Sequence, residues 1–271
     1  AVHMKGHGLM FVLGLAAYMH DSAVCLVHDG EVVAFAEEER FRRVKHFGGF
    51  PDEALRYCLR EAGIGINEIE HIGFFWRPWV GLAQRAFQTV AFLPDSLAQS
   101  GERYQRLRRM GALPRLLRRE WGYRNRFHFV DHHDAHLCSA FHASPFDTAA
   151  VLSIDGNGEI CTSRFAVGRG VRIRRLKDLL YPHSLGILYL CVTEYLGFQE
   201  NSGEGKVMGL AAYGEPLYAK PLSRVLRRNG AGNLRLDMSY FDVHLAKRDY
   251  VTRKFVERFG ARREREGPME Q

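Results

Sequence analysis

Two histidines four residues apart form the clearest chemical pattern in this sequence. His132 and His136 lie at the start of an apolar stretch, 137–143, that we expect to be helical. On a helix, residues i and i+4 share a face, so the two imidazoles could hold one cation. His133 points about 100° away and is left for another task. The pattern is equally compatible with a polar helix start whose histidines meet solvent or backbone groups.

Carboxylates nearby favour the metal interpretation. Asp155 ends an apolar strand directly before a glycine turn, where its carboxylate would face a cleft. Asp131 and Asp134 could accept hydrogen bonds that fix the tautomers of the imidazoles. Two imidazoles and one carboxylate suit Fe(II), Zn(II) or Mn(II), with further positions left open for a ligand. We therefore predict a divalent transition metal held by His132, His136 and Asp155.

Two glycine-containing segments could contact phosphate. The first follows Asp155 and consists of Gly156, Asn157, Gly158 and Glu159. Glycines after a strand let backbone amides approach phosphate oxygens, although a simple hairpin turn is the alternative. The second places Lys206 among glycines, but it lacks the glycine spacing and the Ser or Thr of a Walker motif. Lys206 is a candidate anion contact, with a surface lysine as the default interpretation.

His20 is a candidate general base. It lies in the polar segment 18–22, where the first apolar strand breaks. An imidazole that titrates near neutral pH can accept a proton from a substrate hydroxyl if it faces a cleft. A lone histidine in a turn is more often simply exposed.

The elements that must position these residues occur twice along the chain. The first set consists of strands at 11–17, 23–27 and 31–36, followed by a helix at 52–62. Asp29-Gly30, between the second and third strands, is a hairpin signal. We expect that helix to be capped by Asp52 and ended by Gly63. About 140 residues later the pattern returns, with strands at 149–154, at 159–167 and through Arg174, then a helix at 185–196.

This repeat predicts an α/β fold of two homologous lobes that face each other across a cleft, the arrangement of actin, hexokinase and Hsp70. We expect the first lobe at 10–147 and the front part of the second lobe at 148–271. A generic α/β meander is the alternative.

Residues 77–126 read as a helical insertion in the first lobe that could wall a substrate pocket. Between positions 101 and 127 the insertion carries nine arginines against two glutamates. Such a run could attract a polyanion such as nucleic acid, but no series of aromatic residues alternates with it. We favour the solvated face of helices.

The composition is that of an ordinary globular chain. Of 271 residues, 46% are apolar and 12% aromatic, which is enough for a buried core. The five cysteines include no CxxC pair and stand among apolar neighbours, which is typical of reduced core cysteines in a cytoplasmic protein. The apolar run 9–17 is too short for a membrane span and lacks a cleavage site, and residues 1–4 look like a cloning remnant.

Taken in order, several blocks of this sequence resemble one enzyme family, the O-carbamoyltransferases of nodulation-factor, cephamycin and tobramycin biosynthesis. The blocks run from about Leu13 to Gly214 and are jointly very specific. They are 14–23 (GLAAYMHDSA), 29–31 (DGE), 37–46 (EEERFRRVKH), 50–51 (FP), 132–136 (HHDAH), 139–141 (SAF), 155–159 (DGNGE), 182–186 (PHSLG) and 201–211 (NSGEGKVMGLA).

The resemblance implies an actin-like domain with duplicated RNase-H-like lobes, related to the threonylcarbamoyl-transfer proteins of tRNA modification. Carbamoyl phosphate and ATP would first give carbamoyl-adenylate at a YrdC-like domain. The actin-like domain would then pass the carbamoyl group to a hydroxyl of a small-molecule acceptor. Transfer from such a mixed anhydride needs a base for the acceptor oxygen and charge neutralisation for the leaving AMP.

The family's motifs also imply roles for residues of this sequence. His132, His136 and Asp155 would hold the metal, with Fe(II) expected before Zn or Mn. His20 would deprotonate the acceptor hydroxyl. The nucleotide contacts would be Lys45, His133, Lys206 and the turn of Asp155, Gly156, Asn157, Gly158 and Glu159.

The sequence departs from the family's pattern where it stops, at Gln271. Family members continue through the rest of the second lobe, with a further metal carboxylate, into the YrdC-like domain. We therefore expect a fragment with an incomplete second lobe that alone makes no carbamoylated product. Two rival functions are a sugar or acetate kinase of the same superfamily, which has no need for the histidine pair, and a non-catalytic nucleic-acid or partner-binding module. A salt titration of nucleic-acid binding separates the second rival, because phosphate contacts give a steep salt dependence.

Overall fold

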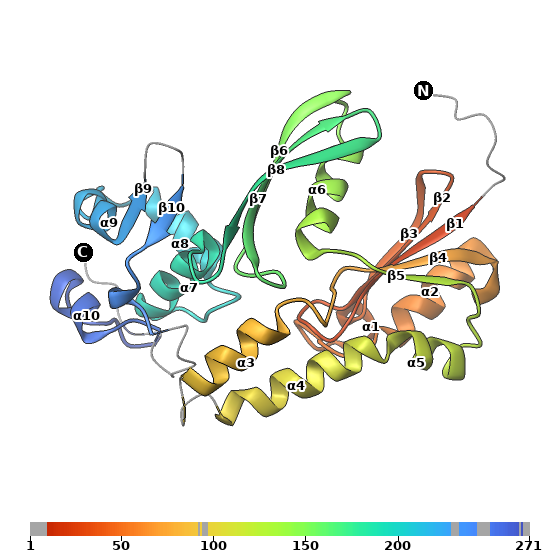
Figure 1. The fold of residues 1–271 in the computed structure, drawn as a ribbon, viewed down its shortest axis with the longest axis horizontal. Coiled ribbons are helices and arrows are strands. Elements are labelled where there is room, and N and C mark those ends of the chain that lie inside the picture. Colours follow the sequence, from red (N-terminus) through yellow and green to blue (C-terminus); the bar gives the residue numbers. More distant parts are fainter. Residues whose placement is uncertain are drawn as a thin grey trace. The chain divides into compact units, whose positions relative to one another are not determined.

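The computed structural model of the chain describes residues 10–91, 93, 97–228, 233–242, 250–265 and 267 (Figure 1). Residues 1–4, expected to be a cloning remnant, lie outside the described residues. The chain forms two compact units. Unit 1 consists of Ala1–Val80 and Gly101–Ala135, and unit 2 of Gly81–Ser100 and His136–Gln271.

Unit 1 is built on a five-stranded sheet with the strand order β3-β2-β1-β4-β5. The strands are β1 (Phe11–Ala16), β2 (Ala23–His28), β3 (Glu31–Glu37), β4 (Ile69–Phe74) and β5 (Arg126–Phe129). The first three strands form an antiparallel meander, and β4 and β5 run parallel to β1. This order and direction are those of an RNase-H-like lobe, as the sequence predicted.

Local sequence explains the meander and the helix that covers it. Asp29 and Gly30 both have positive φ, 50° and 87°, which a tight hairpin turn with right-handed strand twist requires. Helix α2 (Asp52–Ala62) lies next to β2 and β3 and buries Ala54, Leu55 and Cys58. It ends at Gly63 in the left-handed conformation, as predicted. The predicted Asp52 cap is wrong, because Pro51 takes the cap position and Asp52 is the first helical residue.

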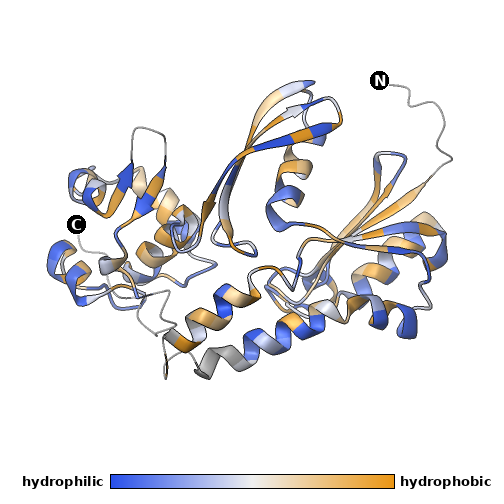
Figure 2. Ribbon diagram, in the orientation of Figure 1, coloured by the Kyte–Doolittle hydropathy of each residue, from blue (hydrophilic) through white to orange (hydrophobic). Residues whose placement is uncertain are grey.

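The stretch between β4 and β5 is helical, as predicted for residues 77–126. Its helices are α3 (Leu82–Ala91), α4 (Leu97–Gly111) and α5 (Leu113–Glu120), of which α3 and the start of α4 belong to unit 2. Met110, Leu113 and Leu117 are buried, whereas all nine arginines between positions 101 and 127 are exposed. Figure 2 shows the hydrophilic colour over much of α4 and α5. The arginines thus lie on the solvated side of helices, the interpretation favoured from the sequence. Unit 1 also contains two short elements, α1 (Glu39–Arg42) and a 3-10 turn at Ile66–Glu68.

Unit 2 repeats the antiparallel meander in a three-stranded sheet, ordered β6-β7-β8. Its strands are β6 (Thr148–Ile154), β7 (Cys161–Arg169) and β8 (Arg172–Leu180). The second strand begins two residues later than expected, because a turn occupies the intervening positions, and the third continues beyond Arg174 to Leu180. Helix α6 (His132–His142) packs Leu137 and Phe141 against Val151 and Ala166 of this sheet.

A second cluster in unit 2 surrounds helix α7 (Leu185–Tyr195), close to the predicted bounds of 185–196. The other elements here are α8 (Glu204–Ala211), α9 (Ala219–Val225), β9 (Leu226–Arg228), β10 (Leu234–Leu236), a 3-10 turn at Met238–Tyr240 and α10 (Arg253–Phe259). Cys191, Phe241 and Phe255 are buried in the cluster. Meander followed by helix therefore occurs in both units, and the fold is the mixed α/β, actin-like type predicted from the repeat.

All five cysteines are free thiols, and three of them, Cys58, Cys161 and Cys191, are buried as predicted. Cys138 contradicts the prediction of core cysteines, because it is exposed on α6, one residue after the buried Leu137. Among the helices of the described residues, none combines the length and the apolarity that a membrane crossing needs.

Candidate metal centre and nucleotide turn

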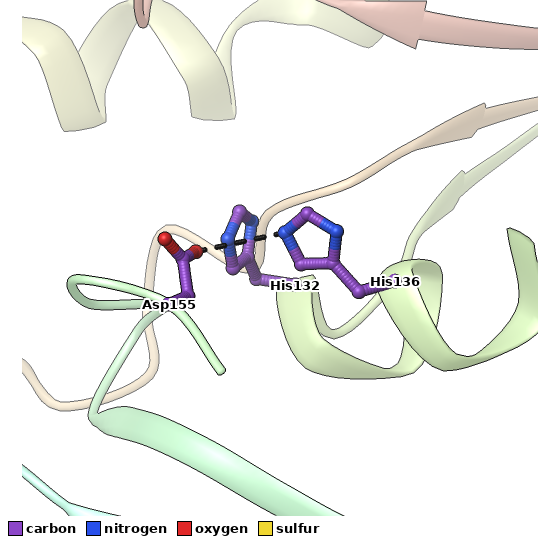
Figure 3. Close-up of side chains that lie close together, drawn as sticks. All are labelled: His132, His136 and Asp155. Atoms are coloured by element: carbon purple, nitrogen blue, oxygen red, sulfur yellow. Dashed lines mark ion pairs between the residues drawn. The ribbon is translucent and has the colours of Figure 1, made fainter. Parts of the chain in front are cut away.

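Three side chains with metal-binding atoms lie together around the start of helix α6 and the end of strand β6 (Figure 3). Each of His132, His136 and Asp155 offers one ligand atom, and these atoms all lie within 4.8 Å of one another. Nε2 of His136 lies 3.5 Å from Oδ2 of Asp155. The structure therefore brings together the three residues that the sequence predicted as metal ligands.

Asp131 determines where helix α6 begins and hence where both histidines point. Its Oδ1 accepts a hydrogen bond from the amide of Asp134 at 3.1 Å, the pattern of an N-cap residue. The buried carboxylate also forms an ion pair with Arg77. A negative charge at this end of a helix is favourable, because the helix dipole is positive there.

Aromatic rings support the imidazole of His132. Its ring centre lies 5.5 Å from that of Phe75 and 5.2 Å from that of Trp76. His133, on the next position of the helix, is fully buried and lies edge-on to His132, with ring centres 5.5 Å apart. His132 is therefore held by aromatic packing, while its metal-binding atom lies with those of His136 and Asp155.

The turn that carries Asp155 is fixed against the start of helix α7. Ser184 caps that helix by accepting from the amide of Ile187 at 3.0 Å, and its hydroxyl donates to the carbonyl of Gly156 at 2.7 Å. Gly186 lies so close to the turn that a Cβ atom there would come within 2.5 Å of the nitrogen of Gly156. Only glycine fits at position 186 without displacing the turn.

The side chain of Asp155 is oriented by its own turn. The amide of Gly156 donates to Oδ1 at 2.6 Å, which leaves Oδ2 on the side of His136. A carboxylate held in this way presents one oxygen to a cation without needing to reorganise.

The predicted nucleotide turn is partly accessible and partly buried. Gly156 is half-buried and Asn157 is exposed, whereas Gly158 and Glu159 are buried. The carbonyl of Glu159 accepts a hydrogen bond from Nη2 of Arg85 at 2.8 Å. The turn also closes the β6–β7 hairpin, so the phosphate and hairpin interpretations describe the same residues.

The remaining predicted site residues lie on other elements. His20 and Lys45 belong to loops of unit 1 and are exposed, and Lys206 is exposed on α8 of unit 2. Nδ1 of His20 lies 2.8 Å from a carboxylate oxygen of Asp21. The histidine is therefore not the simple solvated side chain that a lone turn histidine would be.

Sequence reasoning missed Ser184 and Gly186 as parts of the site. Both stand in the block 182–186, and a serine directly before an apolar helical run is an N-cap signal. That signal locates the start of α7, but it does not reveal the contact with residues 155–156, which are about thirty positions away in the chain.

Comparison with known proteins identifies the family. The family described as "Carbamoyltransferase N-terminus" matches residues 11–267. The chain belongs to the carbamoyltransferase family. Nodulation protein NolNO of Sinorhizobium fredii is 38% identical over 202 residues, covering 73% of this chain and 28% of that protein. Uncharacterized protein sll1178 of Synechocystis is 40% identical over 271 residues, covering 96% of this chain and 44% of that protein.

The chain thus spans less than half the length of the curated relatives it matches. Among solved structures, YeaZ from Pseudomonas aeruginosa is 15% identical at a TM-score of 0.32, covering 64% of this chain and 68% of that one. That score is too low to support an inference.

The residues present fit a transition-metal ion. Metal–ligand bonds of about 2.1 Å place two ligand atoms on one ion no more than about 4.2 Å apart, which the pair of His136 and Asp155 already satisfies. The side chain of His136 is 51% exposed, so a small rotation can adjust its distance to His132. Two imidazoles and a carboxylate are a donor set that Fe(II), Zn(II) and Mn(II) accept.

Proposed function

We propose that this chain is part of an ATP-dependent O-carbamoyltransferase that moves a carbamoyl group from carbamoyl-adenylate to a hydroxyl of a sugar or secondary metabolite. The observation that carries the proposal is the grouping of His132, His136 and Asp155 in a chain that matches the carbamoyltransferase N-terminus over 11–267. A sugar kinase of the same fold would have no need for this group.

The proposed metal centre would serve the leaving nucleotide. When bound, a divalent cation would supply positive charge and Lewis acidity beside the negative charge that develops on AMP. His132 and His136 are positioned by the start of α6, and Asp155 by the hydrogen bond that its Oδ1 accepts from the amide of Gly156. These residues would therefore bind and orient the charged groups without rearranging during transfer.

The proposed nucleotide contacts combine backbone and side-chain donors. Gly156 and Asn157 are the open part of the 155–159 turn. The amide of Gly156 already donates to Asp155, so the backbone at Asn157 is the part of the turn that would approach a phosphate. Lys45 and Lys206 are exposed cations that can neutralise phosphate charge. Glu159 and His133 are buried, so in this proposal they would shape the floor of the site rather than reach the outer phosphates.

His20 is the proposed general base. Its Nδ1 faces Asp21, so its Nε2 is left to accept the proton of the acceptor hydroxyl as the new O–C bond forms. A base is needed because a neutral alcohol is a weak nucleophile toward a mixed anhydride.

The proposal includes the wider arrangement expected from the family. The first actin-like lobe would cover 10–147 and the start of the second 148–271, and carbamoyl-adenylate would come from a YrdC-like domain. Carbamoyl phosphate and ATP would be its substrates. A cytoplasmic setting is part of the proposal, because all five cysteines are free thiols.

Metal analysis of His136→Ala tests the centre. The purified chain, dialysed against Fe(II) without oxygen and in parallel against Zn(II) and Mn(II), should bind one ion that the variant loses. Removing one of three ligands should weaken binding by at least about 10-fold. His142→Ala is the matched control, since His142 is exposed on the last turn of the same helix. Equal metal content in His136→Ala and His142→Ala would sink the proposed centre.

The reaction itself is tested in the whole protein. Carbamoyl phosphate, ATP and a panel of aminoglycosides, cephems and oligosaccharides should give a carbamoylated product with at least one acceptor, detected by mass spectrometry. ATP-dependent phosphorylation of an acceptor, with no carbamoylation, would instead favour the kinase.

A further inference from the structure

Two loops of unit 1 are joined beside His20. The first, 18–22, follows β1, and the second, 46–49, follows α1. The amide of Ser22 donates to the carbonyl of Phe47 at 2.9 Å, and its hydroxyl donates to that of Gly49 at 2.7 Å. A Cβ atom on Gly48 would come within 2.3 Å of the carbonyl oxygen of Met19, so the backbones are in close contact.

Asp21 stands between two imidazoles in this joined structure. Its Oδ2 lies 2.8 Å from Nδ1 of His20, and its Oδ1 lies 2.9 Å from Nδ1 of His46. The backbone is unusual here, because Tyr18, Asp21 and His46 all have positive φ values, of 65°, 56° and 56°. Non-glycine residues adopt this region at an energetic cost, and such residues cluster at functional sites.

The chemistry of the two contacts determines where the protons are. An ionised carboxylate can only accept hydrogen bonds, so Nδ1 of each neutral imidazole must carry its proton. The lone pair of each ring is then on Nε2. Partial burial raises the pKa of Asp21, but the hydrogen bonds from His20 and His46 outweigh it and hold that pKa below the ordinary value.

We propose that Asp21 is a positioning residue that locks His20 and His46 in the Nδ1–H tautomer. Its role in transfer rests on the proposed function of His20 as base. His46 occupies the second carboxylate oxygen and prevents Asp21 from rotating away from His20. His46 is itself held, since its amide donates to a carboxylate oxygen of Glu39 at 3.1 Å. When His20 accepts the acceptor's proton at Nε2, the carboxylate stabilises the resulting imidazolium.

Two substitutions at position 21 keep the backbone conformation and change the acceptor. Asn and Gly both tolerate positive φ, so Asp21→Asn and Asp21→Gly can adopt the loop geometry. An amide offers one acceptor oxygen and one donor nitrogen, so in Asp21→Asn only one of the two imidazoles can keep its Nδ1–H bond. In Asp21→Gly both bonds are lost.

The matched control is Asp29, another aspartate with positive φ beside a histidine. Oδ2 of Asp29 lies 3.9 Å from Nε2 of His28, too far for a hydrogen bond. Asp29→Asn and Asp29→Gly therefore repeat the backbone change without touching the proposed lock.

Nitrogen NMR of the histidine-labelled chain above the titration range of histidine reads the tautomers directly. His20→Gln and His46→Gln assign the signals. We expect both rings in the Nδ1–H form in the wild type, one of them converted in Asp21→Asn, and both in exchange between tautomers in Asp21→Gly. The Asp29 variants should match the wild type. An unchanged His20 tautomer in Asp21→Gly, or an Nε2–H form in the wild type, would overturn the proposal.

Rates in the whole protein separate this proposal from the role of the base. With preformed carbamoyl-adenylate, Asp21→Gly should lower kcat by on the order of 10²-fold or more with little change in KM. If the tautomers change as expected but kcat does not, the lock stands and the assignment of His20 as base fails. If His20→Ala loses activity while Asp21→Gly keeps both tautomer and kcat, the base stands and the lock fails.

Discussion

Replacing Gly186 by alanine should destabilise unit 2, although the same change usually stabilises a helix. Gly186 is the second residue of α7 and faces the turn that carries Asp155. A Cβ atom there would lie 2.5 Å from the nitrogen of Gly156 and 2.6 Å from the carbonyl carbon of Asp155. Both neighbours are backbone atoms of a turn that Ser184 already holds, so they cannot move as a flexible side chain would.

The magnitude follows from two opposing effects. Alanine in place of glycine in a helix is favourable by about 0.5–1 kcal/mol, because glycine loses more backbone entropy on folding. Forcing an extra carbon into a packed site costs about 1–3 kcal/mol. The contact distances here are shorter than real Cβ contacts, so the upper part of that range applies and we expect a net loss of about 1–2 kcal/mol.

Gly209→Ala in α8 is the matched control, because nothing lies within 4 Å of a Cβ atom built there. It should be neutral or stabilising by about 0.5–1 kcal/mol. Urea unfolding followed by circular dichroism compares the two variants, and metal dialysis reports whether Asp155 has moved. A Gly186→Ala protein as stable as Gly209→Ala, with unchanged metal affinity, would refute the argument from close packing.

Other outcomes concern His20 and Asp21. His20→Ala in the whole protein should abolish carbamoyl transfer, while pyrophosphate is still released from ATP in the presence of carbamoyl phosphate. The reason is that the two steps are proposed for different domains. A parallel loss of pyrophosphate release would contradict the base role. The hydrogen bonds from His20 and His46 hold the pKa of Asp21 in the folded protein below 3.8, its value in the unfolded chain. They therefore stabilise the folded state fully at a pH above the unfolded-state pKa, and this stability is lost as the pH falls through the folded-state pKa. Asp21→Asn should therefore flatten the fall of the urea midpoint below about pH 4 relative to the wild type. Identical acid profiles for the variant and the wild type would count against the interaction.

Local signals account for most of the sheet of unit 1 and its helix α2. Alternating burial along β1 and β2 matches the apolar runs of the sequence, and the Asp29-Gly30 turn is a two-residue signal that needs no distant partner. Helix α2 has the predicted bounds, because its apolar face and Gly63 are both local. The sequence predicted Asp52 as the cap, whereas Pro51 is the cap and Asp52 is the first helical residue. Proline and aspartate are both favourable at a helix start, so the sequence located the start but not which of the two residues is the cap.

The metal centre was predictable in part. Helical spacing alone places His132 and His136 on one face, and the end of an apolar strand before glycine exposes Asp155. The spacing does not say in which direction α6 presents that face. Leu137 and Phe141 set the direction by packing against Val151 and Ala166, and such tertiary contacts are not encoded in the local sequence pattern. The exposure of Cys138 follows from the same rotation of the helix.

The pairing of Asp21 with His46 lay beyond sequence reasoning for a different reason. The two residues are 25 positions apart in segments with no periodicity, so neither helix nor strand spacing relates them. Their relation depends on backbone bonds from Ser22 and on the missing side chain of Gly48, which lets Met19 approach. A carboxylate placed by such contacts keeps its position only while both loops are joined. Changes at Gly48 should therefore act on His20 through Asp21, although Gly48 carries no side chain to touch either of them.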